Sequence, residues 1–164
     1  DALPISSPHE RQFASDYLDA DEKDMAWALI RSACWFGFSG ILLSANSVDW
    51  TNPKAVRASM GGVFSLRILT NIDIAALLPE IRREYILVGS DPHRGVAPHA
   101  LTNKAALLLG SESHGLPDHL LGEVHERWRI PGGGGAESLS LPQAAAIMMY
   151  KMVDGGWCPS TGSG

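Results

Sequence analysis

Apolar residues along the chain fall into two alternating patterns, short unbroken runs and longer stretches with helical spacing. The unbroken runs predict buried β-strands at residues 40–44, 63–69, 85–89, 105–110 and 128–131. The helical spacing predicts helices at residues 21–36, 53–60, 72–83, 116–121 and 141–153. Apolar strands that alternate with helices are typical of a parallel sheet covered on both faces. The predicted fold class is therefore α/β, an open parallel sheet with helices on both faces.

The two ends of the chain lack this alternation. Residues 1–20 show weak periodicity, and the pattern places no strand in them. Residues 155–164 are rich in glycine, serine and proline, which is typical of a flexible tail. With 164 residues, the chain has the size of one domain. We therefore expect one domain over residues 21–154, between a poorly defined N-terminal segment and a flexible tail.

The composition limits the class of partner. The formal net charge is −5, which disfavours a domain that holds nucleic acid by bulk positive charge but leaves room for a local basic patch. The two cysteines, Cys34 and Cys158, lie far apart in no metal-binding pattern. This favours a reducing compartment, the cytoplasm or alternatively a mitochondrial or other organelle matrix. No run of 18 apolar residues predicts a membrane span.

Three predicted strands are followed by loops rich in glycine and small polar residues. These loops begin at Gly89, Gly110 and Pro131. In an open α/β sheet, ligands bind beyond the carboxyl ends of strands, where glycine lets the backbone approach them. One such loop is more often a tight turn, but three at successive strand ends predict a shared pocket. The pocket is not a P-loop, because Leu116 stands where a P-loop needs lysine, and the sequence has no G-x-G-x-x-G motif.

Motifs in these regions resemble those of one family. Residues 110–116 read GSESHGL, residues 130–140 read IPGGGGAESLS, and residues 52–62 read NPKAVRASMGG. In order and spacing they resemble the motifs of SpoU/TrmH-type RNA 2′-O-ribose methyltransferases of the SPOUT superfamily. The stretch from Arg31 to Gly37 resembles the first motif of that family. The resemblance covers most of the chain.

The resemblance implies a topology and a cofactor. The family has a deep C-terminal trefoil knot, and its threading requires slim loops such as residues 110–115 and 132–135. The knot binds S-adenosylmethionine, largely through backbone groups. The contacts carried over by position are Val88, Gly89, Ser90, Gly110, Ile130, Pro131, Leu139 and Ser140. Ile130 and Leu139 are expected to flank the adenine.

The implied reaction is methyl transfer to a ribose 2′-hydroxyl of RNA, with rRNA favoured over tRNA and no metal required. Arg31 matches the catalytic arginine of the family. Because an arginine stays protonated, we expect it to hold an RNA phosphate and stabilise the developing oxyanion rather than act as a base. Glu112 and Ser138 are the other expected catalytic residues. The residues expected to contact RNA phosphates are Lys54, Arg57 and Arg67.

The resemblance also implies a homodimer. The family dimerises through its knotted region, and its first-motif arginine works near the cofactor of the other subunit. The expected interface therefore consists of residues 144–153 and the helix around Arg31. A ribosomal particle is a further expected partner. In this acidic chain, affinity for RNA must come from a local basic cluster, a partner subunit or a further domain.

The first motif departs from the family pattern at two positions. Met25 stands where the family has asparagine, and Trp27 where it has glycine. Methionine cannot orient a substrate by hydrogen bonding, and a tryptophan side chain is large enough to block access of RNA. A second hypothesis therefore stays open, a catalytically impaired SPOUT-like protein that binds RNA or a ribosomal particle as an assembly or structural factor. A third is a small-molecule α/β enzyme of the flavodoxin type.

Overall fold

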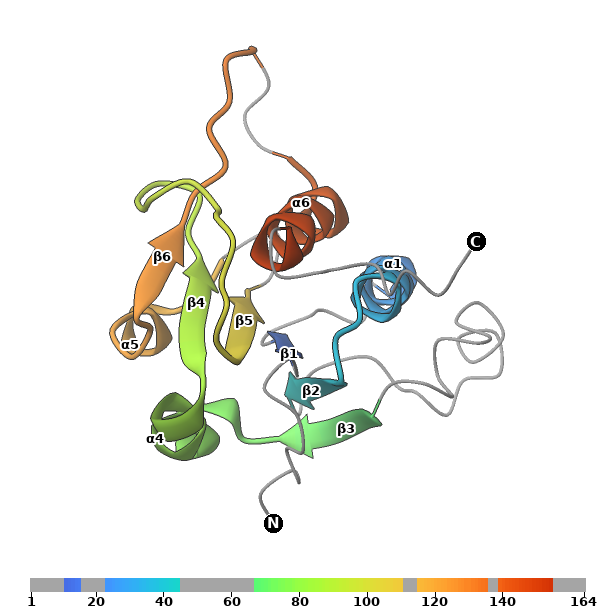
Figure 1. The fold of residues 1–164 in the computed structure, drawn as a ribbon, viewed down its shortest axis with the longest axis vertical. Helices are drawn as coiled ribbons and strands as arrows, with labels where there is room; N and C mark the ends of the chain where they lie inside the picture. The colour runs from blue at the N-terminus through green and yellow to red at the C-terminus, as the bar shows by residue number, and fades with distance from the viewer. Residues whose placement is uncertain (1–10, 16–22, 45–66, 111–114, 136–138, 155–164) are drawn as a thin grey trace.

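A six-stranded sheet forms the centre of the molecule (Figure 1). The computed structural model describes residues 11–15, 23–44, 67–110, 115–135 and 139–154. The strands are β1 (Arg11–Ser15), β2 (Gly40–Ser44), β3 (Arg67–Ile72), β4 (Ile86–Ser90), β5 (Ala105–Leu109) and β6 (Glu126–Trp128). Their order across the sheet is β3-β2-β1-β5-β4-β6, and all these pairings are parallel.

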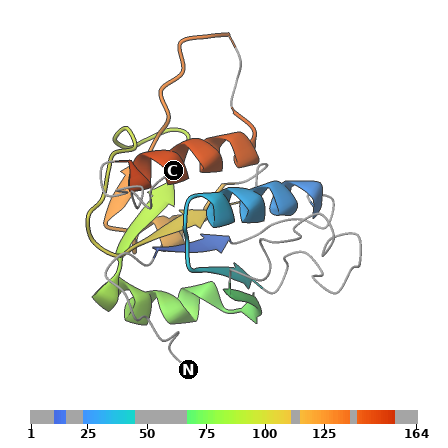
Figure 2. The same ribbon diagram turned by 45° about the vertical axis from the view of Figure 1, so that its right-hand side comes forward.

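Helices cover both faces of this sheet. The described helices are α1 (Lys23–Trp35), α4 (Ile74–Glu84), α5 (Asp118–Leu121) and α6 (Leu141–Val153). Helices α1 and α6 lie side by side on one face, and α4 lies on the other (Figures 1 and 2). Leu120 and Leu121 of α5 belong to the same core cluster as Leu78 of α4. The predicted α/β class, with an open parallel sheet between helices, is confirmed. None of the described helices is long and apolar enough to cross a membrane.

The central strands have apolar runs because they lie between two hydrophobic cores, one on each face of the sheet. All five residues of β5 are buried. Leu107 and Leu109 belong to the core under α1 and α6, whereas Leu108 belongs to the core under α4. Successive side chains of a strand point to opposite faces, so a strand covered on both sides must be apolar throughout. This is why the pattern places β4 and β5 to within one residue.

Strand β1 is the main difference between the predicted and the observed sheet. It lies between β2 and β5, within the N-terminal segment where the pattern places no strand. Its sequence, RQFAS, has one large apolar side chain, that of Phe13. A five-residue strand with so few apolar positions shows no clear alternation. Its place in the sheet is set by pairing with both neighbours, which is tertiary information.

Several other boundaries also move. Strand β6 spans Glu126–Trp128 rather than residues 128–131. It is an edge strand, which tolerates charged residues, and a prediction based on apolar residues alone does not include Glu126 and Arg127. Helix α4 begins after Asp73, whose Oδ1 accepts a hydrogen bond from the Ala76 N–H at 3.2 Å. Helix α5 is two residues shorter than predicted, and β3 runs on to Ile72. The predicted helix at 53–60 lies outside the described residues, whereas β2 and α6 match their predictions.

Gly95, in the connection between β4 and β5, lies where another residue is strained. Its φ is +135°, and a Cβ atom would run into the backbone carbonyl of Arg127. Gly95→Ala is therefore expected to lower the free energy of unfolding by about 2 kcal/mol. Urea denaturation measures this change. The matched control is Gly122→Ala, because Gly122 has φ −68° and only ordinary contacts around a Cβ; equal losses in both variants would contradict the prediction.

Candidate functional site

The predicted cofactor residues converge at the carboxyl ends of three neighbouring strands. Strand β4 lies between β5 and β6, and Ser90 at its end pairs with Trp128 at the end of β6. Gly110 directly follows β5, and Ile130 follows β6 by two residues. Because the strands are parallel and in register, the chain leaves all three at one edge of the sheet. We call Ser90, Gly110, Ile130 and Pro131 the carboxyl edge.

Val88 and Gly89 lie inside the sheet and offer a ligand only backbone atoms. Val88 is fully buried in the core under α1 and α6. A Cβ atom at Gly89 would lie 3.1 Å from Val124 and 3.2 Å from Leu121. Apolar side chains of the protein itself therefore fill the space beside Gly89, and its contact with a cofactor stays a prediction.

Gly110 allows the loop after β5 to return on itself. A Cβ atom at this position would overlap the backbone of Gly115 and Leu116. Gly115 has φ +66°, a conformation that favours glycine. Two of the expected catalytic residues, Glu112 and Ser138, lie outside the described residues. Their roles stay predictions.

The loop after β6 leaves the carboxyl edge and comes back at α6. Its described part, residues 131–135, extends away from the sheet and is exposed (Figure 2). Ser140 begins α6 as its N-cap, and its Oγ accepts a hydrogen bond from the Gln143 N–H at 3.4 Å. The next residue, Leu141, belongs to the same core cluster as Val88 and Trp128, and Ile130 packs against that cluster. The start of α6 is thus held by the core that supports the carboxyl edge.

These residues fit an adenosyl cofactor in their chemistry. Leu139 is 45% exposed and Ile130 is partly buried, so both keep apolar surface that an adenine ring can cover. The glycines at 132–135 leave backbone N–H and C=O groups without side chains in the way. Among the described residues, no group of three or more His, Cys, Asp or Glu side chains is placed to hold a metal ion.

Asp91 fixes the turn that follows Ser90. Its side chain is buried, and its Oδ1 accepts hydrogen bonds from the backbone N–H groups of His93 at 2.9 Å and Arg94 at 3.2 Å. Its Oδ2 lies 3.5 Å from Nη1 of Arg127. The Asp91 N–H donates to the carbonyl of Trp128 at 3.0 Å. The exit of β4 is therefore tied to β6, a role that the sequence analysis does not assign although an aspartate after a strand is a turn signal.

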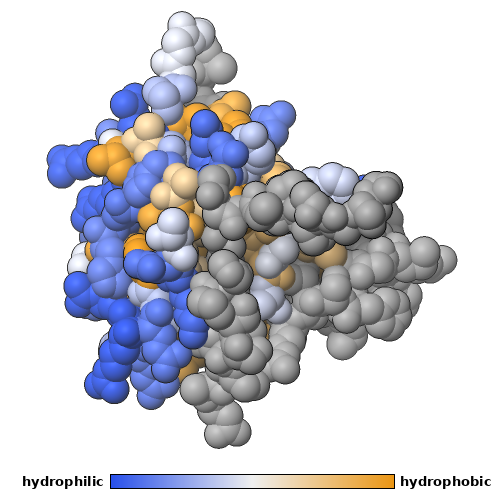
Figure 3. Space-filling model, in the orientation of Figure 1, coloured by the Kyte–Doolittle hydropathy of each residue, from blue (hydrophilic) through white to orange (hydrophobic). Residues whose placement is uncertain are grey.

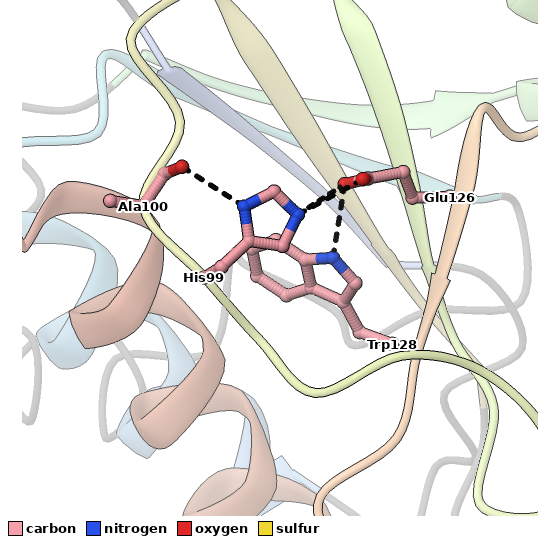
Figure 4. Close-up of polar contacts among 4 residues, drawn as sticks. All are labelled: His99, Ala100, Glu126 and Trp128. Atoms are coloured by element: carbon pink, nitrogen blue, oxygen red, sulfur yellow. Dashed lines mark hydrogen bonds and ion pairs between the residues drawn. The ribbon is translucent and has the colours of Figure 1, made fainter.

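A second polar cluster joins the connection between β4 and β5 to β6 (Figure 4). Nε2 of His99 lies 2.9 Å and 3.0 Å from the two carboxylate oxygens of Glu126. Nδ1 of His99 lies 3.1 Å from the carbonyl oxygen of Ala100. The indole N–H of Trp128, a fully buried residue, donates to Glu126 at 3.2 Å. Because both imidazole nitrogens of His99 face acceptors, the ring is suited to hold the chain together as a cation rather than to take up a proton in catalysis.

The His99–Glu126 pair predicts a pH dependence of stability. The hydrogen bond to Glu126 raises the pKa of His99 above its usual 6.5. The stabilisation is therefore fully present below the unfolded-state pKa and is lost as the pH rises through the raised folded-state pKa. Urea denaturation of the parent and of His99→Gln, from pH 5.5 to 9 in roughly unit steps, is expected to show a difference that shrinks with rising pH. A difference that grows with pH would contradict this assignment.

Arg31 lies on the exposed face of α1. Trp35, one turn further along α1, is 84% exposed. Within the described part of the chain, Arg31 forms no hydrogen bond or ion pair, and no described contact joins it to the carboxyl edge. Met25 and Trp27 also belong to α1, but their side chains lie outside what the structure describes. The prediction that Trp27 blocks access of RNA stays a prediction.

Of the three residues predicted to bind RNA, the structure describes only Arg67. Arg67 begins β3, which is the edge strand at the far side of the sheet from β6. Lys54 and Arg57 lie outside the described residues. Among the described residues, Ser90, Gly110 and Ile130 lie at the carboxyl edge, whereas Arg67 lies at the far side of the sheet.

The chain is similar to known methyltransferases over most of its length. The profile of the SpoU rRNA Methylase family matches residues 27–150. The 23S rRNA (uridine(2479)-2′-O)-methyltransferase of Streptomyces viridochromogenes is 31% identical in an alignment of 134 residues that covers 77% of this chain and 47% of that protein. The chain spans about half the length of the curated relatives that it matches.

Two solved structures with AdoMet are similar in fold. The SpoU methyltransferase AviRb from Streptomyces viridochromogenes, in complex with AdoMet, has a TM-score of 0.76 and 27% identity, with 90% of this chain and 58% of that chain covered. The AdoMet-bound rRNA methyltransferase from Sinorhizobium meliloti has a TM-score of 0.74 and 27% identity, with 88% and 56% covered. Both of these proteins were solved with AdoMet bound.

Proposed function

Because the chain belongs to the SpoU rRNA Methylase family, we propose that it transfers the methyl group of S-adenosylmethionine to a ribose 2′-hydroxyl of rRNA. The convergence of three glycine-containing loops and the start of α6 at the carboxyl edge carries this proposal. The names of the relatives described above support it, and none of those relatives favours a protein that has lost catalysis. The same family membership disfavours the flavodoxin-type alternative.

The proposed cofactor site uses backbone more than side chains. Ser90 and the buried Val88 and Gly89 present main-chain groups at the end of β4. Gly110 and Pro131 present them on either side. The apolar side chains of Ile130 and Leu139 flank the adenine, and Ser140 completes the contacts. The cofactor, when bound, supplies a methyl group on a sulfonium sulfur, whose leaving group is a neutral thioether.

The 2′-hydroxyl is a weak nucleophile, and the proposed role of Arg31 is to assist it. A guanidinium binds a phosphate through two parallel hydrogen bonds and stabilises negative charge that develops on a nearby oxygen. Glu112 and Ser138 are the proposed further catalytic residues. Lys54, Arg57 and Arg67 are proposed to hold RNA phosphates through charge.

A homodimer offers Arg31, which has no described contact with the carboxyl edge, a route to a cofactor. Trp35 of α1 and Ile147 and Tyr150 of α6 expose 84%, 39% and 50% of their surfaces. Phe36, which directly follows α1, packs against Tyr150 of α6 with ring centroids 6.0 Å apart. An exposed apolar surface across two adjacent helices suits a second copy of the chain. In such a dimer, Arg31 of one protomer serves the cofactor of its partner.

The deep trefoil knot is the proposed topology of the C-terminal region. The connection between β4 and β5 contacts two elements that come later in the chain. The Val96 N–H donates to the carbonyl of Arg127 at 2.9 Å, and the Leu101 N–H donates to the carbonyl of Met152 at 3.1 Å. A connection held against both β6 and the end of α6 supports a C-terminal segment threaded through a loop.

The function is tested by methyl transfer to RNA. The full chain is incubated with S-adenosylmethionine that carries a tritiated methyl group and with total rRNA. Ribose 2′-O-methylation blocks alkaline cleavage of the next phosphodiester, so label in alkali-resistant dinucleotides is the expected result. A chain that binds both cofactor and rRNA but transfers no label would instead support the impaired SPOUT-like protein.

A further inference from the structure

A hollow lies at the end of the sheet opposite the carboxyl edge. Its volume is about 400 Å³, and its walls come from three separate segments. Arg82 and Arg83 lie in the last turn of α4, Lys104 directly precedes β5, and His125 directly precedes β6. We call this feature the basic hollow. Because the strands are parallel, it lies where β4, β5 and β6 begin, whereas the carboxyl edge lies where they end.

The cations of the basic hollow have no acidic partners among the described residues. The ion pairs found there join His99 with Glu126 and Arg127 with Asp91, and none involves Arg82, Arg83 or Lys104. Glu84 also lines the hollow but is paired with none of these three cations. The surface over α4 is hydrophilic (Figure 3). In a chain with a net charge of −5, this concentration of cations makes a local positive potential.

Helix ends alone do not explain this arrangement. Basic residues are favoured in the last turn of a helix, so Arg82 and Arg83 by themselves need no ligand. Lys104 and His125 come from other segments, so the preference of helix ends for basic residues does not explain why they lie beside Arg82 and Arg83. The Leu87 N–H donates to Nδ1 of His125 at 2.9 Å, and the His125 N–H donates to the Leu87 carbonyl at 2.9 Å. These bonds fix the imidazole and leave Nε2 as its hydrogen-bond donor.

We propose that the basic hollow binds a phosphate group of the RNA backbone. This inference rests on the proposed function, for which it names a substrate contact away from the reacting ribose. Phosphate is the favoured ligand because every charged side chain that lines the hollow, except Glu84, is a hydrogen-bond donor. The aromatic ring of Tyr85, which also lines the hollow, is buried and offers no face for a base to stack on. The contact is therefore independent of base sequence.

The length of β4 separates this contact from the methyl donor. At about 3.3 Å per residue, a five-residue strand places the basic hollow on the order of 15 Å from the carboxyl edge. The hollow therefore holds a nucleotide other than the one that is methylated. Its residues position the RNA and do not touch the reacting atoms, so their loss is expected to raise KM and leave kcat unchanged.

The test replaces the two arginines of α4 together. In Arg82→Gln/Arg83→Gln, the Kd for a fluorescent single-stranded uridine oligomer of about 20 nucleotides is expected to rise about tenfold at low salt. The slope of log Kd against log salt is expected to become shallower by about 0.7 for each lost phosphate contact. Calorimetry is expected to show unchanged affinity for S-adenosylmethionine. A folded variant that binds the oligomer as the parent does overturns the proposal.

A matched pair of acidic residues supplies the control. Glu84 lines the basic hollow, whereas Glu80, one turn earlier on the same helix, does not. Glu84→Gln is expected to tighten RNA binding about threefold, and Glu80→Gln, with the same change of charge, is expected to have a much smaller effect. If the two variants changed RNA affinity equally, only the net charge of the protein would affect binding, and the proposal of a local site would be overturned.

Two further outcomes separate this inference from its alternatives. Competition by inorganic phosphate at micromolar concentration would show a site for free phosphate and overturn the assignment to RNA. If the parent chain methylates rRNA and the arginine variant binds RNA as the parent does, the RNA site in the basic hollow is overturned and the proposed function is not. If the parent chain transfers no methyl group but the arginine variant loses RNA affinity, the proposed function is overturned and the RNA site in the basic hollow is not.

Discussion

Arg31→Ala is expected to lower kcat for methyl transfer by about 10²- to 10³-fold, because it removes a charged donor that stabilises the developing oxyanion. Affinity for S-adenosylmethionine is expected to stay unchanged, since Arg31 lies on α1 and has no described contact with the carboxyl edge. Steady-state transfer of tritiated methyl to rRNA measures kcat, and calorimetry measures cofactor binding. Arg31→Lys, which keeps the charge but loses the planar donor pair, is expected to fall between the parent and the alanine variant.

Mixed dimers test whether Arg31 serves its own subunit or the partner. The second variant is Leu139→Asp, which places a carboxylate at an exposed position of the proposed adenine site. If each site combines Arg31 of one protomer with the cofactor of the other, mixing the two inactive variants restores about a quarter of the parent activity. No restored activity in dimers shown to exchange subunits would place Arg31 and the cofactor in the same protomer.

Trp128→Ala is expected to lower the free energy of unfolding by about 3–5 kcal/mol, the largest loss of stability expected for this chain. Trp128 is fully buried in the core under α1 and α6, and its indole N–H donates to Glu126. The alanine variant leaves a large cavity and removes a donor from a partly buried carboxylate. In a thermal melt this corresponds to a fall in Tm of about 10 °C for a chain of this size.

Trp128→Phe separates the two causes. Phenylalanine fills most of the space but donates no hydrogen bond, so a loss of about 1–2 kcal/mol is expected. Both variants also change the contact with the ring of His99, whose centroid lies 5.5 Å from that of Trp128. If the phenylalanine variant were as unstable as the alanine variant, the hydrogen bond to Glu126 rather than packing would dominate.

The predictability of the fold follows how completely each element is buried. Strand β5 is buried on both faces, and its apolar run marks it in the sequence. Helix α6 is marked by Pro142 in its first turn and by buried residues at helical spacing. Strand β1 is central in the sheet, yet RQFAS carries too few apolar residues to be recognised, because its position depends on pairing with β2 and β5.

The candidate site was predictable where it is continuous in sequence. The motifs that begin at Gly110 and Ile130 indicate the family and the carboxyl edge, because each motif is a single loop at a strand end. The bond between Asp91 and Arg127 and the basic hollow were not predictable in this way. Their members are far apart in the chain and come together only through the parallel register of β4, β5 and β6.

The contact between the β4–β5 connection and α6 has a consequence for biosynthesis. Leu101 is bonded to Met152, and half of the proposed methyl-donor site comes from residues after β6. A nascent chain that has emerged only as far as β5 therefore lacks Ile130, Leu139 and Ser140. Under the proposed function, the methyl-donor site is therefore complete only once the last helix has emerged from the ribosome and docked.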